Sequence, residues 1–449
     1  MQDDSMTGTA CSGAERAAAG LWGASAEERA VGARLDGDVD ADLCVVGGGV
    51  LGVAAALSAA EAGASVLLCE AGAIGLGATG RSGGQIWAGF KPLPGTLARD
   101  HDAADAARLE ALAAKAPQVV FDLVERHQIR CRPDRRGTVV GVHSAAALPE
   151  ACRKFDALRK DGQPVEWMDA DTIAVAIGTP AYFGGWRHAA GGTVQPLSFV
   201  RGLARAAEAA GARLAIDTPA TRLVRNGCGW RVETPRGTVR AGAVLLATNG
   251  YSGPLLPPLR RSVVPVESAQ VATAPHPAVL EGRILSGIAC VSDTRRSLLY
   301  FRPSPDGRLV MGGRGGMMGA AGRWRFGRLR ARAEWLFPEL AGCQWEEAWS
   351  GKVAMTLDSL PHVHNPEPML FCALGFNGRG MALGTAFGTE LGRALAVGAS
   401  GAEDADFGVG LPLSPLREVP FHRLHRLGVA AVATGYLLRD LWDERPRNR

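Results

Sequence analysis

Residues 42–70 constrain the fold of this 449-residue chain more than any other stretch. The apolar run at residues 42–46 predicts a strand that is buried on both faces in a parallel sheet. An Ala- and Leu-rich segment at residues 50–62 then predicts a helix, and residues 65–69 predict a second strand. The order strand, helix, strand indicates a βαβ unit of an α/β fold.

Three glycines, Gly47, Gly49 and Gly52, join the first strand to the helix at the G-x-G-x-x-G spacing. The first glycine permits a tight turn, the second lets the backbone approach a pyrophosphate, and the third allows close packing between helix and strand. Glu70 ends the second strand, 18 residues after Gly52, where a carboxylate accepts hydrogen bonds from ribose hydroxyls. The pattern predicts a dinucleotide site; the alternative is a glycine-rich turn in an ordinary α/β protein.

A second glycine-rich loop follows at residues 71–85, with the sequence AGAIGLGATGRSGGQ. So many glycines after the acid-bearing strand suggest backbone wrapped around a large, flat group. The expected backbone donors and one cation come from Thr79, Gly80, Arg81, Ser82, Gly83 and Gly84.

The motifs GGGVLG and GATGRSGGQ, with Glu70 between them, resemble the FAD-binding start of the D-amino-acid oxidase superfamily. The resemblance is to its γ-glutamylputrescine oxidase-like amine oxidases in particular, which more often carry Asn where this chain has Ser82, and it extends over residues 21–443. It implies an α/β fold in which an FAD-binding Rossmann-type (glutathione-reductase-like) domain is joined to a second, antiparallel-sheet α+β substrate domain.

This resemblance implies a discontinuous domain organisation. We expect residues 40–95, 190–258 and 355–449 to form the FAD-binding domain, and residues 96–189 and 259–354 the substrate domain. Residues 1–20 lack the basic start and apolar core of a signal peptide and are expected to be a disordered leader.

Hydrophobic spacing and turn residues give the remaining elements. Helices are expected near residues 103–126, 146–159, 197–210 and 325–337, and period-2 alternation predicts an antiparallel sheet over residues 261–313 with a turn at residues 305–307. Residues 182–188, His362 and His364 are expected in loops.

Residues 370–396 repeat the pattern of strand, glycine turn and helix, which points a helix N-terminus at something negative or electron-accepting. The resemblance implies that this turn lies under the flavin pyrimidine and that Ala220 meets the adenine. The residues expected to bind FAD are Gly47, Gly49, Val50, Leu51, Gly52, Glu70, Ala71, Thr79, Gly80, Arg81, Ser82, Gly84, Gln85, Ala220, Ala247, Thr248, Asn249, Gly378, Arg379, Gly380, Met381 and Ala382.

Composition excludes several classes of function. The net charge is only +4 and has no basic stripe, which argues against nucleic-acid binding. Nine scattered cysteines without a C-x-x-C pair predict free thiols, no metal site and a cytoplasmic location. The apolar run at residues 427–438 is too short for a transmembrane span.

Flavin oxidation of an amine needs little acid–base machinery, because a free amine delivers a hydride to flavin N5 and the resulting iminium hydrolyses in water. We therefore expect a small-molecule amine or amino-acid-like substrate, with O2 as the acceptor. Candidate catalytic residues are Trp87, Tyr300, Arg302, Lys352 and Arg379, with Phe90 and Lys91 nearby. The alternative for each is a packing or surface residue.

Val353 follows Gly351 and Lys352 where glycine oxidase-like members of the superfamily carry an Arg that holds the substrate carboxylate. This difference favours an amine or N-substituted amine over a simple α-amino acid, unless Lys352 or Arg302 replaces that Arg. Two other functions stay open: a dehydrogenase that passes electrons to a carrier, and a flavin-binding subunit without turnover.

Overall fold

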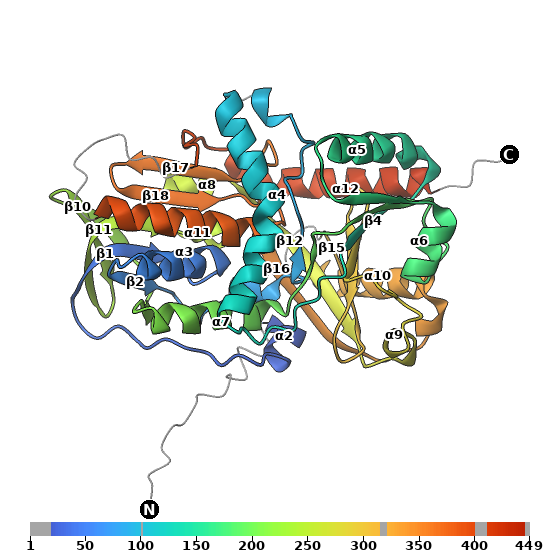
Figure 1. Ribbon diagram of the computed structural model, residues 1–449, viewed down its shortest axis with the longest axis horizontal. Coiled ribbons are helices and arrows are strands. Elements are labelled where there is room, and N and C mark those ends of the chain that lie inside the picture. The colour runs from blue at the N-terminus through green and yellow to red at the C-terminus, as the bar shows by residue number, and fades with distance from the viewer. Residues whose placement is uncertain (1–18, 100–101, 315–320, 400–410, 445–449) are drawn as a thin grey trace, which may run out of the picture.

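The computed structural model describes residues 19–99, 102–314, 321–399 and 411–444, and it contains two large sheets side by side (Figure 1). The first sheet has the strand order β17-β18-β11-β1-β2-β8, and β10 and β9 continue from β11. Its strands are β1 (Val39–Val46), β2 (Val66–Cys69), β8 (Arg213–Ala215), β9 (Arg222–Asn226), β10 (Gly229–Thr234), β11 (Gly237–Leu246), β17 (His362–Glu367) and β18 (Leu370–Leu374).

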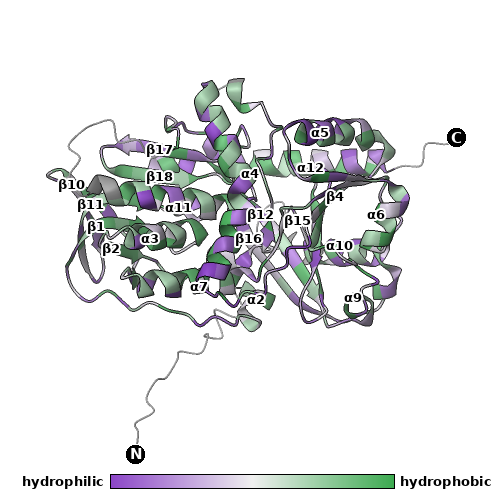
Figure 2. Cartoon of the chain, in the orientation of Figure 1, coloured by the Kyte–Doolittle hydropathy of each residue, from purple (hydrophilic) through white to green (hydrophobic). Residues whose placement is uncertain are grey.

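Five neighbouring strands of this sheet, from β18 to β8, run parallel, as the βαβ pattern predicts. The last four residues of β1 and all of β2 are buried, because helices cover the sheet face. Helices α3 (Val50–Glu61), α7 (Pro196–Ala209) and α11 (Gly380–Ala399) lie side by side on that face (Figure 1). Much of α3 and α11 is hydrophobic, whereas α5 (Leu148–Lys160) carries many hydrophilic residues (Figure 2).

Glycines set the distance between α3 and α11. A Cβ atom added at Gly388 would lie 2.3 Å from the carbonyl oxygen of Leu51, and one added at Gly392 would lie 2.2 Å from that of Ala55. Both contacts are too short for any side chain, so the helices pack backbone against backbone. This packing explains the glycines within an otherwise apolar helix.

The second sheet has the order β16-β12-β15-β14-β13-β4-β6-β5. It is antiparallel, as expected, except that β4 and β13 run parallel. The turn predicted at residues 305–307 joins β14 to β15, and Gly307 has a φ of +82°. The strands are β4 (Thr138–Gly141), β5 (Val165–Met168), β6 (Gly185–His188), β12 (Val264–Thr273), β13 (Cys290–Asp293), β14 (Leu299–Pro303), β15 (Leu309–Arg314) and β16 (Trp345–Met355).

Shorter elements and outer helices complete the fold. They are α2 (Leu21–Ala24), α4 (Ala103–Arg126), α6 (Ala170–Ile177), α8 (Pro257–Arg261), α9 (Pro277–Leu280), α10 (Ala321–Leu336) and α12 (His425–Asp443), the paired strands β3 (Gln85–Ile86) and β7 (Gly192–Thr193), and the 3-10 turns η1 (Thr79–Arg81), η2 (Leu97–Arg99), η3 (Ala145–Ala147), η4 (Asn249–Tyr251), η5 (Pro338–Leu340) and η6 (His422–Leu424). Among the helices that the structure describes, none has the length and hydropathy to cross a bilayer.

Two helices pack against the domain to which the sequence did not assign them. Helix α4 falls within the expected substrate domain, yet Leu109, Ala113 and Val120 are buried in the core beneath α11. Helix α12 falls within the expected FAD-binding domain, yet its last turn bonds to residues 296–297, beside the second sheet. The domain boundaries stay a prediction, and the expected leader lies outside the described residues for all but its last two positions.

Two expected loops are strands. Residues 185–188 form β6 between β4 and β5, where a Cβ atom at Gly185 would lie 2.2 Å from the carbonyl oxygen of Val140. This glycine marks a close strand contact where the sequence suggested a loop. His362 and His364 lie on β17, with stacked rings whose centroids are 5.6 Å apart, because alternate residues of a strand share a face.

Candidate functional site

One cavity of about 1210 Å³ runs from the glycine turn after β1 to the second sheet and the last turn of α12. Ordinary small-molecule sites occupy roughly 300–1,000 Å³, so this cavity has room for a large cofactor together with a substrate. Its wall combines residues from the stretches 46–51 and 69–94 and from the turn before α11 with residues of β12, β14 and β16.

The three motif glycines have three different surroundings. Gly47 has a φ of +113°, which L side chains rarely adopt, and a Cβ atom at Gly52 would lie 2.0 Å from the carbonyl oxygen of Gly47. Gly49 instead lines the cavity, and its added Cβ would meet only Thr79 Oγ1, at 3.3 Å. The turn and the helix packing therefore need Gly47 and Gly52, whereas Gly49 leaves open space that a phosphate group fits.

Glu70 is held at the end of β2 by the glycine turn. Its Oε2 accepts a hydrogen bond from the Gly48 backbone N–H at 2.6 Å, and its Oε1 accepts one from the Gly72 N–H at 2.9 Å. Each carboxylate oxygen can accept a further bond. Glu70 therefore lines the cavity in a position to accept from a ribose hydroxyl.

The second glycine-rich loop is fixed by hydrogen bonds to distant elements. Thr79 Oγ1 accepts from the Val50 N–H at 3.0 Å, at the start of α3. The carbonyl oxygen of Arg81 accepts from Gln270 Nε2 at 2.5 Å and from Trp349 Nε1 at 3.1 Å, and the Arg81 side chain lines the cavity. The loop thus joins the two sheets.

Most residues expected to bind FAD line this cavity: Gly47, Gly49, Val50, Leu51, Glu70, Ala71, Thr79, Arg81, Ser82, Gln85, Ala220, Ala247, Thr248, Asn249, Gly378, Arg379, Gly380 and Met381. Gly52, Gly80, Gly84 and Ala382 do not line it. A Cβ atom at Gly80 would lie 2.6 Å from the carbonyl oxygen of Gly75, and one at Gly84 would lie 2.2 Å from that of Val194. These glycines shape the loop through close backbone packing, so their direct contact with FAD stays a prediction that the cavity wall does not support.

Four of the five predicted catalytic residues, Trp87, Tyr300, Lys352 and Arg379, line the cavity. The Nη1 atom of Arg379 donates to the carbonyl oxygens of Ala88, at 2.6 Å, and Gly89, at 2.9 Å. Its guanidinium carbon lies 6.0 Å from the ring centroid of Trp87, and burial lowers the pKa of Arg379 to about 10. Arg379 is therefore a fixed cation beside Trp87.

Tyr300 lies on β14 and Lys352 on β16, two strands of the second sheet that β12 and β15 separate. The Tyr300 hydroxyl is 2.9 Å from Ser268 Oγ, and burial raises the pKa of Tyr300 to about 12. The Lys352 Nζ lies 5.1 Å from the ring centroid of Tyr251. Tyr300 therefore stays a neutral phenol at physiological pH.

Arg302 does not line the cavity, so its predicted contact with substrate stays a prediction that this position does not support. Only 3% exposed, it donates from Nη1 to the carbonyl oxygens of Val194, at 2.7 Å, and Gly83, at 3.3 Å. Its guanidinium carbon lies 5.4 Å from the ring centroid of Trp22. These contacts direct Arg302 beneath the glycine-rich loop, so it does not replace a carboxylate-binding Arg.

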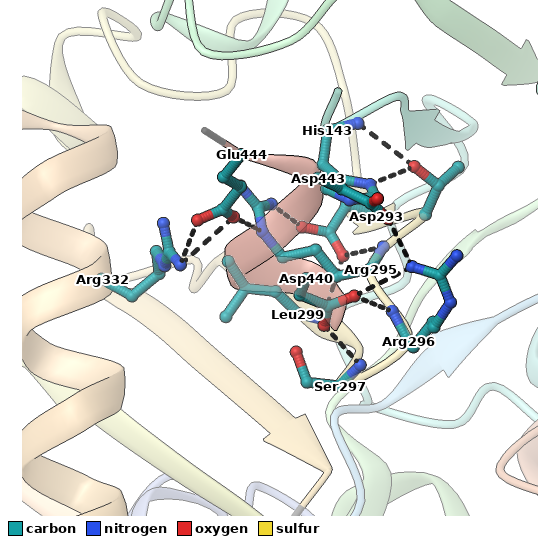
Figure 3. Close-up of polar contacts among 11 residues, drawn as sticks. His143, Asp293, Arg295, Arg296, Ser297, Leu299, Arg332, Asp440, Asp443 and Glu444 are labelled. Atoms are coloured by element: carbon teal, nitrogen blue, oxygen red, sulfur yellow. Dashed lines mark hydrogen bonds and ion pairs between the residues drawn. The ribbon is translucent and has the colours of Figure 1, made fainter. Parts of the chain in front are cut away.

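No sequence motif predicted the polar cluster at the far end of the cavity, where Asp443 of α12 lines the wall. Figure 3 shows the contacts of this cluster. Asp440 accepts from the backbone N–H groups of Arg296, at 3.0 Å, and Ser297, at 2.9 Å. Arg295 pairs with buried Asp293 and donates from Nε to Glu444 at 2.7 Å. The acidic and basic residues gathered at 293–296 and 439–444 are the sequence signal of this cluster.

Lys91 lines the cavity between Trp87 and the second sheet, and its charge is strongly perturbed. Burial, together with the positive charges of Arg314 and Arg379, lowers the pKa of Lys91 to about 7. Burial and Arg379 likewise lower the pKa of His188, on β6, to about 4. This end of the cavity is thus electropositive.

Comparison with known proteins agrees with this geometry. The family described as FAD dependent oxidoreductase (DAO) matches residues 42–394. A probable oxidoreductase OrdL of Rhizobium meliloti is 32% identical over 84% of this chain and 88% of its own length. Gamma-glutamylputrescine oxidoreductase of Escherichia coli is 29% identical over 93% of this chain and 97% of its own length. The crystal structure of glycine oxidase from Geobacillus kaustophilus superposes with a TM-score of 0.67 at 24% identity, covering 85% of this chain and 99% of that one.

Proposed function

Because the chain belongs to the DAO family of FAD-dependent oxidoreductases, we propose that it oxidises an amine or N-substituted amine with O2 as the electron acceptor. The balanced reaction removes two electrons and two protons from the CH–NH unit and reduces O2 to H2O2. Water then hydrolyses the imine to a carbonyl compound and the released amine.

The observation that carries this choice of substrate is the place of Val353. Val353 lines the cavity, and its Cγ1 would lie 3.9 Å from a Cβ atom at Gly378, in the glycine turn before α11. An apolar side chain at this point offers no charge to a carboxylate on the reacting carbon. The printed name of the Escherichia coli relative, gamma-glutamylputrescine oxidoreductase, supports an amine substrate as well.

The residues present fit FAD. Gly49 opens the cavity wall at the start of α3, Glu70 offers carboxylate oxygens beside it, and residues 378–381 line the cavity at the N-terminus of α11. A helix N-terminus stabilises negative charge. Bound FAD supplies the two-electron acceptor, and the protein supplies binding, orientation and electrostatics.

The side chains around the substrate end suit an uncharged amine. Trp87 and Tyr300 contribute aromatic surface, and the fixed positive charge of Arg379 disfavours an ammonium beside it. Since the free amine carries the lone pair that oxidation needs, this electrostatic environment favours the reactive form.

Anaerobic mixing of the purified holoenzyme with a panel of amines and α-amino acids tests this function. We expect amines to bleach the flavin absorbance, and we expect air to restore the colour with one H2O2 per flavin. Bleaching that persists in air but is reversed by an artificial acceptor would indicate a dehydrogenase instead. Absence of bleaching by every compound would favour a flavin-binding subunit without turnover.

A further inference from the structure

The substrate end of the cavity carries positive charges that have no acidic partner. We propose that the oxidised amine also bears a carboxylate, separated from the reacting carbon by a spacer and bound by Lys91 and Arg314 with Arg379 beside them. This inference rests on the proposed amine oxidation and specifies the class of its substrate.

The three cations come from three separate elements and all line the cavity. Lys91 lies in the segment after β3, Arg314 ends β15, and Arg379 lies in the turn before α11. In the part of the chain that the structure describes, none of the three forms an ion pair, and the sequence at residues 315–320, next to Arg314, is free of acidic residues.

Several other charges on the cavity wall are matched by ion pairs. Arg295 pairs with Asp293 and Glu444, Arg296 with Asp443, and Glu267 with Arg325. Arg81, Lys154 and Lys352 also line the wall without an ion pair among the described residues. Lys91, Arg314 and Arg379 nevertheless form a group of their own, because the two arginines lie close enough for their positive charges to lower the pKa of Lys91.

An unpaired cation in a cavity wall costs free energy unless a ligand compensates it. The positive charges of Arg314 and Arg379 already disfavour the charged form of Lys91. A bound carboxylate reverses this effect, because an opposite charge nearby favours the charged form. A carboxylate is thus the chemical group that this wall complements.

The carboxylate must lie away from the reacting carbon. Val353 is the apolar neighbour of the Gly378 turn, and buried Arg302 is directed elsewhere. Arg314 lies on the side of the cavity closed by α12, where its guanidinium carbon is 5.7 Å from the ring centroid of Tyr436. An ω-amino acid meets both requirements, whereas an α-amino acid does not.

The first experiment compares three amines of equal chain length by anaerobic flavin reduction: 5-aminopentanoate, its amide and pentylamine. A charge-assisted hydrogen bond is worth about 1.5–3 kcal/mol, so we expect the acid to exceed the amide in kcat/KM by roughly ten- to a hundredfold. Lys91→Gln and Arg314→Gln should each reduce that ratio by about tenfold or more.

Lys115→Gln is the matched control, because it removes the same charge from an exposed position on α4. We expect it to keep the ratio. Equal kcat/KM for acid and amide in the wild type would overturn the inference. So would a Lys91→Gln enzyme that slows all three amines by one common factor, because that result makes Lys91 a proton acceptor.

Calorimetric titration of the holoenzyme with glutarate gives a readout without turnover. The affinity should be constant below pH 7 and fall by up to about tenfold per pH unit above it, because free Lys91 loses its proton there. The Arg379 guanidinium keeps its charge below pH 9 and His188 stays neutral, so Lys91→Gln should abolish the slope.

The two experiments separate this inference from the proposed function. If no amine reduces the flavin but glutarate binds with the expected slope, the amine oxidation is wrong and the carboxylate site stands. If amines reduce the flavin and glutarate shows no binding, the function stands and the carboxylate site is wrong.

Discussion

The two ends of the cavity are built in opposite ways. At the end expected to hold FAD, much of the wall comes from two consecutive glycine-rich stretches around Gly49 and Thr79. At the substrate end, the wall consists of side chains such as Trp87, Tyr300 and Arg314, from elements far apart in the chain. The expected cofactor site therefore depends on residues that are close together in the sequence, whereas the choice of substrate depends on how distant elements pack.

The largest effect on the cofactor end is expected from a substitution at Gly49. Gly49→Val should abolish FAD binding, because the branched side chain fills the open space above Thr79. The measurement is the ratio of flavin to protein after purification, with circular dichroism to confirm folding. Gly428→Ala is the control, because a Cβ atom there meets nothing within 4 Å. A Gly49→Val protein that retains FAD would show that the backbone of this turn is not the pyrophosphate site.

The rate of flavin reduction as a function of pH tests whether the substrate end binds a free amine. An alkylammonium has a pKa near that of Lys, about 10.4, so the free amine increases roughly tenfold per pH unit between pH 7 and 9. We expect the reduction rate at low substrate to rise by up to about a hundredfold over this interval. Arg379 keeps its charge there, since its pKa is about 10.

Arg379→Ala should move this profile to higher pH, because an adjacent cation lowers the pKa of a bound ammonium. Stopped-flow absorbance at each pH provides the measurement. A flat profile in the wild type, with no peroxide after air is admitted, would reject the oxidase mechanism.

At the cofactor end, Glu70→Ala should weaken FAD binding by roughly ten- to a hundredfold, because it removes a charged hydrogen-bond acceptor worth about 1.5–3 kcal/mol. The substitution also leaves the N–H groups of Gly48 and Gly72 without their acceptor. Flavin release on dilution, followed by fluorescence, gives the dissociation constant. Glu70→Gln, which keeps one acceptor oxygen, should lie between the wild type and the Ala variant.

Arg302 lies outside the cavity, beneath the glycine-rich loop, and its replacement should affect stability more than substrate binding. Arg302→Ala leaves the carbonyl oxygens of Val194 and Gly83 without a donor, which we expect to lower the free energy of unfolding by about 1.5–3 kcal/mol. Urea unfolding measures this loss, and the amine KM should change little. A large rise in KM with unchanged stability would return Arg302 to the substrate site.

Local periodicity was sufficient for the βαβ unit. The apolar run of β1, the glycine spacing and the helix-forming residues of α3 lie within a few residues of one another, and their strand, turn and helix geometry follows from short-range sterics and burial. Helices α4 and α12 show the limit of this reasoning, because each packs against the domain to which the sequence did not assign it. An amphipathic pattern indicates that one face of a helix is buried, but it does not identify the partner.

The sequence by itself therefore determined the parallel sheet, the glycine turns and the nature of the cofactor, since each depends on residues that are neighbours in the chain. Tertiary packing alone places Arg302 beneath the loop, Lys91 near Arg314 and Arg379, and Asp440 on the backbone N–H groups of Arg296 and Ser297. The direction of a side chain and its charge state depend on groups brought together by packing across hundreds of residues. No local pattern encodes those distances.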